Sequence, residues 1–135
     1  MSKIGYEIQS RLPYEQALEE VKEALKAEGF GVLTFINVQE TILEKLEKEF
    51  KPYAILGACN PALAHKALSS DPAIGLLLPC NVTVEDDLNG GSIIRIVNPE
   101  TLLLSLENKP GEQLQEVATQ AGEKIKRVVD DLVRK

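Results

Sequence analysis

The chain has 135 residues, of which 44% are hydrophobic and 27% charged, and its formal net charge is −6. This length suits one domain with its own core, so we expect a single domain over residues 1–135. The acidic balance repels phosphate backbones, and three Tyr, three Phe and no Trp offer no platform for base stacking, which excludes nucleic-acid binding.

No run of residues is long and apolar enough to cross a bilayer. The segment Met1–Tyr6 enters a strand pattern without the apolar core of a signal peptide. We therefore expect a cytoplasmic protein with no membrane segment. The chain has two cysteines. In the cytoplasm these are more often free thiols than a structural disulfide, and two are too few for a four-cysteine zinc site.

Three elements are predicted in the first part of the chain. Alternating apolar residues favour a strand over Lys3–Gln9. Apolar residues then recur at helical spacing from Pro13, which suits a first helical turn, to Gly29, which ends the helix. The run Gly31–Ile36 is typical of a second strand.

A second helix and a central strand follow. Asn37, with Glu40 three residues later, predicts a capping box. We expect this helix to close at Pro52 and to turn four apolar side chains inward: Ile42, Leu43, Leu46 and Phe50. The segment Tyr53–Ala58 is short and apolar, which favours a central strand covered on both faces.

The next predicted helix is capped by Asn60, has Pro61 at its first position and ends near residues 69–72. A strand over Leu76–Glu85 follows, with an edge, a bulge or a bend implied at Pro79. A turn that contains two glycines leads into a last strand over Ser92–Val97.

The chain is predicted to end in helices. The segment Pro99–Leu106 suits one or two helical turns. A long final helix is predicted from eight apolar residues at helical spacing: Leu114, Val117, Ala118, Ala121, Ile125, Val128, Val129 and Leu132. The order βαβαβαββ plus a helix predicts an α/β fold of the mixed α+β kind. We expect a mixed sheet of about five strands with early βαβ crossovers, a late antiparallel hairpin, and helices packed on the sheet.

Motifs of the central region share the pattern of a known family: Asn60-Pro61, Ala64, Ala67-Leu68, Asp71-Pro72, Gly75-Leu76-Leu77-Leu78-Pro79-Cys80, Val82, Val84, Gly90 or Gly91, and Asn98-Pro99. Through them Tyr53–Leu104 resembles the family called domain of unknown function 302. Glu28–Val32 is similar to the family's first helix-to-strand join. The resemblance implies a compact α/β fold and a homodimer. It implies no activity, because the family has none assigned.

Cys59 is the strongest candidate for chemistry. Directly before a capped helix, its sulfur would face unpaired N–H groups and the positive end of the helix dipole, which lowers a thiol pKa and favours a reactive thiolate. The alternative is a buried cysteine that acts as a small hydrophobe. Cys80 alternates with Val82 and Val84, which favours a core thiol. If its strand is a parallel neighbour of Tyr53–Ala58, the two sulfurs can approach.

The only histidine, His65, lies on the second turn of the helix that follows Cys59. It would serve as a base or a third ligand, or would simply be solvated or packed. Cys59, His65 and Cys80 together would suit zinc or another soft metal with an open position, although their spacing matches no compact metal motif. The acidic run Glu85–Asp87 lacks the spacing of a calcium loop and is typical of a solvated face.

The start of the same helix also predicts a place for an anion. The backbone N–H groups of Ala62, Leu63 and Ala64 would hold it, with Asn60 as cap and ligand contact. Gly57 would allow a close approach of the ligand or serve tight packing. The predicted ligand-binding residues are Gly57, Cys59, Asn60, Ala62, Leu63, Cys80 and Asn81.

Three functions remain open. The leading one is non-enzymatic binding of a small molecule or soft metal where the strand Tyr53–Ala58 meets the helix from Pro61. The second is a thiol enzyme or redox sensor in which Cys80 resolves an oxidised Cys59. The third is a structural or interaction module without a ligand.

Overall fold

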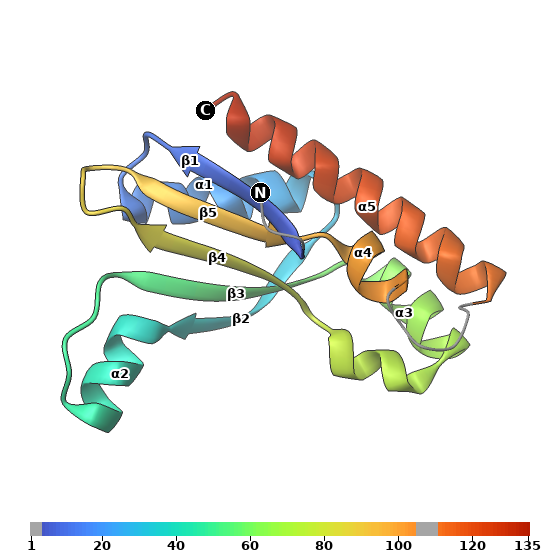
Figure 1. The fold of residues 1–135 in the computed structure, drawn as a ribbon. Helices are drawn as coiled ribbons and strands as arrows, with labels where there is room; N and C mark the ends of the chain where they lie inside the picture. The colour runs from blue at the N-terminus through green and yellow to red at the C-terminus, as the bar shows by residue number, and fades with distance from the viewer. Residues whose placement is uncertain (1–3, 105–110) are drawn as a thin grey trace.

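The computed structural model of the chain describes residues 4–104 and 111–135. Its elements, in chain order, are β1 (Gly5–Ser10), α1 (Tyr14–Ala27), β2 (Gly31–Asn37), α2 (Val38–Leu46), β3 (Tyr53–Cys59), α3 (Pro61–Ser70), the 3₁₀ helix η1 (Pro72–Leu77), β4 (Cys80–Asp86), β5 (Ser92–Val97), α4 (Pro99–Leu104) and α5 (Glu112–Val133) (Figure 1). None of the helices in these described ranges has the length and apolar character needed to span a membrane.

The five strands form one sheet in the order β1-β5-β4-β3-β2, and every neighbouring pair is antiparallel. The α/β class, the five strands and the hairpin of β4 and β5 are confirmed. The expected parallel pairing is wrong: β1 and β2 run in the same direction but lie at opposite edges. β3 and β4 are neighbours, yet antiparallel, because α3 and η1 leave the sheet and return to the same end of it (Figure 1).

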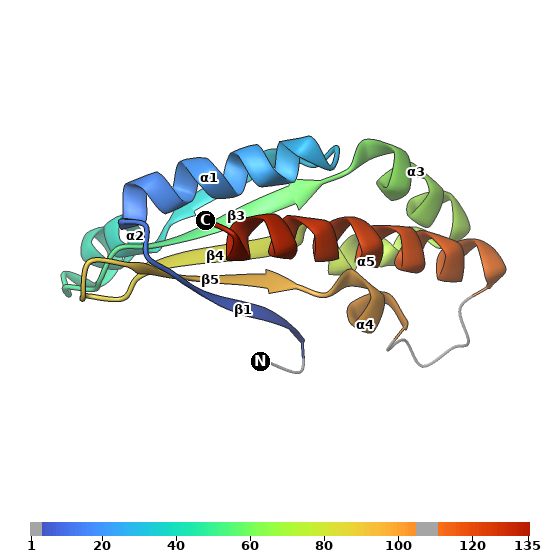
Figure 2. The same ribbon diagram turned by 90° about the horizontal axis from the view of Figure 1, so that it is seen from above.

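Helices α1 and α5 cover one face of the sheet (Figure 2). The strand residues that face them are apolar and buried: Ile8, Ala54, Leu56, Ala58, Val82, Val84, Ile94 and Ile96. Val21 and Leu25 of α1 and Ile125 and Val128 of α5 pack onto this layer. Removing this apolar surface from water, at roughly 25 cal/mol per Å², is the main contribution that holds the two layers together.

The opposite face of the sheet has no helix over it within the described residues (Figure 2). The expectation that β3 is covered on both faces is therefore wrong. Ala54 and Leu56 point into the core, whereas Tyr53 and Ile55 alternate with them and remain partly exposed.

A second, smaller core lies beyond the end of the sheet, where α3, η1 and α4 pack against the first half of α5. Its buried residues are Leu63, Ala67, Ile74, Leu103, Leu114, Val117, Ala118 and Ala121. Helix α5 is long enough to serve both cores, because its second half packs on the sheet. The junction between the two cores lies where β3 ends and α3 begins.

Helix α2 differs from its prediction. It buries no residue, and Leu43 and Leu46 are 54% and 62% exposed. The helix ends at Leu46, and Glu47 adopts a left-handed conformation (φ 54°), so Phe50 lies outside the helix and is 41% exposed. The inward packing expected of this apolar stripe is wrong, because α2 sits beyond the ends of β2 and β3, away from both cores (Figure 1).

Two element boundaries also change. β4 begins at Cys80 and not at Leu76, because Pro72–Leu77 forms η1, with the Asp71 carboxylate accepting the Ala73 N–H at 3.0 Å. The Leu78–Pro79 peptide bond between η1 and β4 is cis. Helix α4 ends at Leu104, and the remainder of the segment predicted to reach residue 106 lies outside the described residues.

Candidate functional site

Asn60 caps α3 at the point where β3 ends and the helix begins. Its side-chain oxygen accepts the Leu63 N–H at 3.3 Å and its backbone oxygen accepts the Ala64 N–H at 2.9 Å, while Pro61 occupies the first helical turn. The predicted cap is thereby confirmed. The expected anion site at this helix start is not available as predicted, because the N–H groups of Leu63 and Ala64 already donate to Asn60.

Asn60 also fixes α3 to another part of the chain. Its side-chain nitrogen donates to the backbone oxygen of Glu28 at 3.4 Å, just after α1. Gly29, with φ 84°, lies so close that an added Cβ would stand 3.0 Å from the same Asn60 nitrogen. Asn60 is therefore first a structural tie between α1, β2 and α3.

Cys80 lies at the start of β4 and directly faces Ala58 of β3. Its side chain is buried, as the alternation with Val82 and Val84 predicted. Burial raises the pKa of the Cys80 thiol to about 11, and the nearby charge of Cys59 adds to the shift. Both cysteines are free thiols, and Cys59 is half-buried.

A cavity of about 30 Å³ lies between the two cores. Its walls come from β3 and β4 (Ala58, Cys59 and Cys80), from the start of α3 (Asn60, Leu63, Ala64 and Ala67), and from Phe30, Leu78, Pro99, Leu103, Val117 and Ala121. The lining is almost entirely apolar and contains no charged side chain. The two sulfurs are its most reactive groups.

The cavity brings together four of the predicted ligand-binding residues: Cys59, Asn60, Leu63 and Cys80. The other three do not line it. Gly57 packs tightly, since an added Cβ would stand 2.6 Å from Cγ of Pro79. Asn81 faces Gly57 across the strand pair and is exposed, and Ala62 is exposed on the first turn of α3.

The three-ligand metal site does not form. His65 is exposed on α3 and does not line the cavity that Cys59 and Cys80 share. Within residues 4–104 and 111–135, no group of three or more His, Cys, Asp or Glu side chains is placed to hold a metal ion. The proposed zinc ligands Cys59, His65 and Cys80 are therefore not assembled in this structure.

The part of the cavity wall that comes from the last third of the chain was not predicted from the sequence. Pro99 and Leu103 of α4 and Val117 and Ala121 of α5 reach the site from the far end of the chain. The signal that was available is the Asn98-Pro99 motif. Asn98 accepts the Glu100 N–H at 3.0 Å and so sets the start of α4, which places Pro99 against the cavity.

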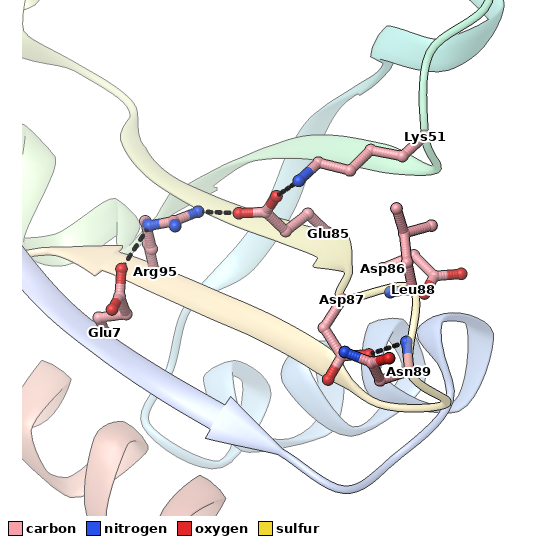
Figure 3. Close-up of polar contacts among 8 residues, drawn as sticks. All are labelled: Glu7, Lys51, Glu85, Asp86, Asp87, Leu88, Asn89 and Arg95. Carbon is pink, nitrogen blue, oxygen red and sulfur yellow. Dashed lines mark hydrogen bonds and ion pairs between the residues drawn. The ribbon is translucent and has the colours of Figure 1, made fainter.

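A second polar cluster lies on the uncovered face of the sheet (Figure 3). One carboxylate oxygen of Glu85 forms an ion pair with Lys51, and the other forms an ion pair with Arg95. Arg95 also forms an ion pair with Glu7, with 2.8 Å between its Nε and the Glu7 Oε1. Glu85 is only 4% exposed, so its assignment to a solvated face is wrong. Burial raises the pKa of Glu85, but the hydrogen bonds and charges of Lys51 and Arg95 outweigh burial and hold this pKa below its usual value.

The two remaining acidic residues of the predicted run shape the β4–β5 turn (Figure 3). Asp86 accepts the Leu88 N–H at 2.7 Å. Asp87 accepts the N–H groups of Asn89 at 2.7 Å and Gly91 at 2.9 Å, which hold the pKa of its carboxyl below the usual value. Both carboxylates therefore act within the turn.

Comparison with known proteins assigns this two-layer α/β domain to a family. The family described as Domain of unknown function DUF302 matches residues 6–132, and the chain belongs to it, as the resemblance indicated. An uncharacterized protein of Aquifex aeolicus (strain VF5) is 25% identical over 122 residues, which cover 90% of this chain and 78% of that protein. The crystal structure of the uncharacterized conserved protein DUF302 from Bacillus stearothermophilus matches with a TM-score of 0.83 and 30% identity, over 97% of this chain and 99% of that one.

Proposed function

We propose that the protein is a binding domain for a small molecule, with its site in the cavity between β3 and α3. One observation carries the proposal: two free thiols, from the facing ends of neighbouring strands, line the same apolar cavity at the junction of the two cores. Cys59, the half-exposed thiol, would meet the ligand first, and Cys80 would contact it from the cavity wall.

The lining favours a small, uncharged ligand. The N–H groups of Leu63 and Ala64 donate to Asn60 within the α3 cap. The Asn60 side chain uses its oxygen to accept the Leu63 N–H and its nitrogen to donate to the Glu28 backbone oxygen. No cation lines the cavity to balance an anion. A volume of about 30 Å³ exceeds the 10–15 Å³ or so that one water needs, and suits a ligand of a few heavy atoms.

A second candidate, a redox pair, is favoured by the cavity that Cys59 and Cys80 both line. Facing Cα atoms on antiparallel strands are roughly 5 Å apart, so Cys59, one residue after the Ala58 that faces Cys80, has its Cα about 6 Å from that of Cys80. A disulfide needs Cα atoms less than about 7 Å apart and side chains that point toward each other. Because side chains alternate along a strand, this bond requires the Cys59 side chain to turn around the end of β3 toward Cys80. A peroxide would oxidise the Cys59 thiol to a sulfenic acid and be reduced to water. The Cys80 thiol would then displace a second water and form the disulfide.

Both candidates suit a cytoplasmic protein. A reducing compartment keeps thiols such as Cys59 and Cys80 free and permits disulfides mainly as transient, sensing bonds. We include this location in the proposal, supported by the two free thiols of the described chain.

Mass spectrometry with methyl methanethiosulfonate tests the site and separates the candidates. This small neutral reagent transfers a methylthio group to a thiolate and releases methanesulfinate. A ligand site predicts a stable methylthio adduct on Cys59 and a much slower reaction of Cys80. A redox pair predicts that Cys80 displaces methanethiol from the adduct, which leaves the protein lighter by two hydrogens. Cys59→Ser is the control, and folded protein that reacts at neither thiol contradicts both candidates.

A further inference from the structure

Gly31, the first residue of β2, lies directly opposite Cys59 on the neighbouring strand β3. Facing side chains of two antiparallel strands leave the same face of the sheet, with their Cβ atoms about 5 Å apart. A side chain at position 31 would therefore stand next to that of Cys59. Gly31 has none and is exposed, so the space beside Cys59 is open on this side.

The fold itself does not require a glycine at position 31. An added Cβ would meet no atom of the described residues within 4 Å beyond its chain neighbours. The φ angle of Gly31 lies outside the left-handed region, whereas that of Gly29, at 84°, lies within it. A glycine in a strand costs stability and often marks a place where a ligand approaches the backbone closely. The open space at Gly31 is thus better explained by an approaching group than by packing.

Pro79 and Thr34 bound this open space on one side. Gly57 precedes Cys59 by two residues, so the two positions share one face of β3. An added Cβ on Gly57 would stand 2.6 Å from Cγ of Pro79 and would also contact Thr34, which faces Gly57 from β2. The face beside Cys59 is therefore filled at Gly57 and open at Gly31. Since β2 contains no charged residue, the open part suits an uncharged group.

The cavity by itself accommodates only one end of a ligand. Its volume is about 30 Å³, whereas pockets that enclose drug-sized molecules measure roughly 300–1,000 Å³. Cys59 lines the cavity and also borders the open space of Gly31. Cys80, which is 8% exposed, lines the cavity from β4. A molecule with a small reactive end in the cavity and a larger body over Gly31 would fill both spaces.

We propose that Gly31 sets the size of the ligand, and that the ligand is a low-molecular-weight disulfide with an uncharged group larger than the cavity. The inference rests on the proposed function, because it assigns a ligand class to the same site. Thiol–disulfide exchange suits a lining of free thiols without charged side chains, since it requires only a deprotonated sulfur and access to it. Cys59 would lose its proton to solvent and attack one sulfur of R–S–S–R. A bond forms to that sulfur, the S–S bond of the ligand breaks, and R–S⁻ leaves and takes up a proton, while the retained R group lies over Gly31.

Reaction rates at Cys59 test the role of Gly31. They are measured by mass spectrometry in a Cys80→Ala background, which leaves Cys59 as the only thiol. Methyl and benzyl methanethiosulfonate release the same leaving group and differ only in the group that they transfer. Gly31→Val should slow the benzyl reagent about tenfold or more and leave the methyl reagent within about twofold of its original rate, because valine fills space that only the larger group needs.

Two further variants and a third probe complete the test. Thr34→Val is the matched control, because it places valine on the same strand without adding volume, and it should change neither rate. Gly31→Ala, whose side chain fills less of the open space, should slow the benzyl reagent by a smaller factor. Far-UV circular dichroism should show all these variants folded, since an added Cβ at position 31 meets no described residue. Bis(2-hydroxyethyl) disulfide, a neutral disulfide, should attach one hydroxyethylthio group to Cys59.

The outcomes separate this inference from the binding site. A Gly31→Val substitution that slows both methanethiosulfonates equally, or neither, overturns the role of Gly31. A Cys59 that reacts with methyl methanethiosulfonate but not with the disulfide overturns the ligand class and leaves the cavity in place. A Cys59 that reacts with none of the three probes contradicts the proposed function as well.

Discussion

Arg95 forms an ion pair with Glu85 on the face of the sheet that no helix covers within the described residues. Arg95 stands on β5 and is 39% exposed at its side chain, while the Glu85 side chain on β4 is 5% exposed. Lys51, from the segment before β3, holds the other carboxylate oxygen. A buried acid on an otherwise open face is thus stabilised by two cations that remain in contact with solvent.

Replacing this acid should destabilise the fold. Glu85→Gln removes a buried charge to which two cations are hydrogen-bonded, and we expect a loss of about 2 kcal/mol in the free energy of unfolding, measured in urea. Glu7→Gln is the matched control on the same arginine: Glu7 is about half exposed, so the loss should stay within about 0.5 kcal/mol. Equal losses in the two variants would contradict this account of Glu85.

The same residue predicts part of the response to acid. The pKa of Glu85 is lowered from 4.5 in the folded protein, so the unfolded chain takes up this proton first as the pH falls. The stability that Glu85 contributes is therefore present above pH 4.5 and lost as the pH drops through the lower folded value. Wild type should lose more stability than Glu85→Gln between neutral pH and about pH 3. Parallel curves would show that Glu85 is not linked to folding.

Cys80 predicts a loss on the alkaline side. Its pKa is raised from 9.0 to about 11 in the folded protein, so the unfolded chain releases the proton first as the pH rises. Stability should be complete below pH 9.0 and fall by at most about 3 kcal/mol as the pH rises through about 11. Cys80→Ala should lack this component. Unfolding in urea across this range, compared between the two proteins, measures it; an identical pH dependence would contradict a buried Cys80 thiol.

The two asparagine caps offer a comparison within one chain. Asn37 and Asn60 each accept one N–H at the start of a helix, but only Asn60 also donates to the Glu28 backbone oxygen. Asn37→Ala should cost about 1 kcal/mol, and Asn60→Ala about 2 kcal/mol because the tie to α1 is lost as well. Thermal unfolding of both variants measures the difference. A larger effect at Asn37 would show that the tie contributes nothing.

Local signals predicted the parts of the site that depend on nearby residues. Asn60 and Pro61 correctly predicted the start of α3, because a helix cap and a first-turn proline affect only the few residues next to them. Alternation with Val82 and Val84 predicted that Cys80 is buried. These inferences need no knowledge of how distant segments meet.

Features that depend on how distant segments pack could not be predicted from the sequence, for physical reasons. Helical periodicity between two strands does not state whether α3 crosses the sheet or returns to the same end, so the antiparallel pairing of β3 and β4 was missed. The apolar stripe of α2 is the same whether it packs inside its own chain or against another. Glu85 reads as a surface acid, because its partner Lys51 comes from a separate segment of the chain.

The central claim is that Cys59 opens onto a cavity that receives a small molecule. The most direct test is the rate at which methyl methanethiosulfonate modifies Cys59, compared between two substitutions on α3. Ala64 lines the cavity and Ala62 does not. Ala64→Leu should slow the reaction about tenfold or more, which corresponds to roughly 1.4 kcal/mol on the barrier, while Ala62→Leu leaves it near the wild-type rate. Equal rates in the two variants, or an unreactive Cys59 in wild type, would contradict the site.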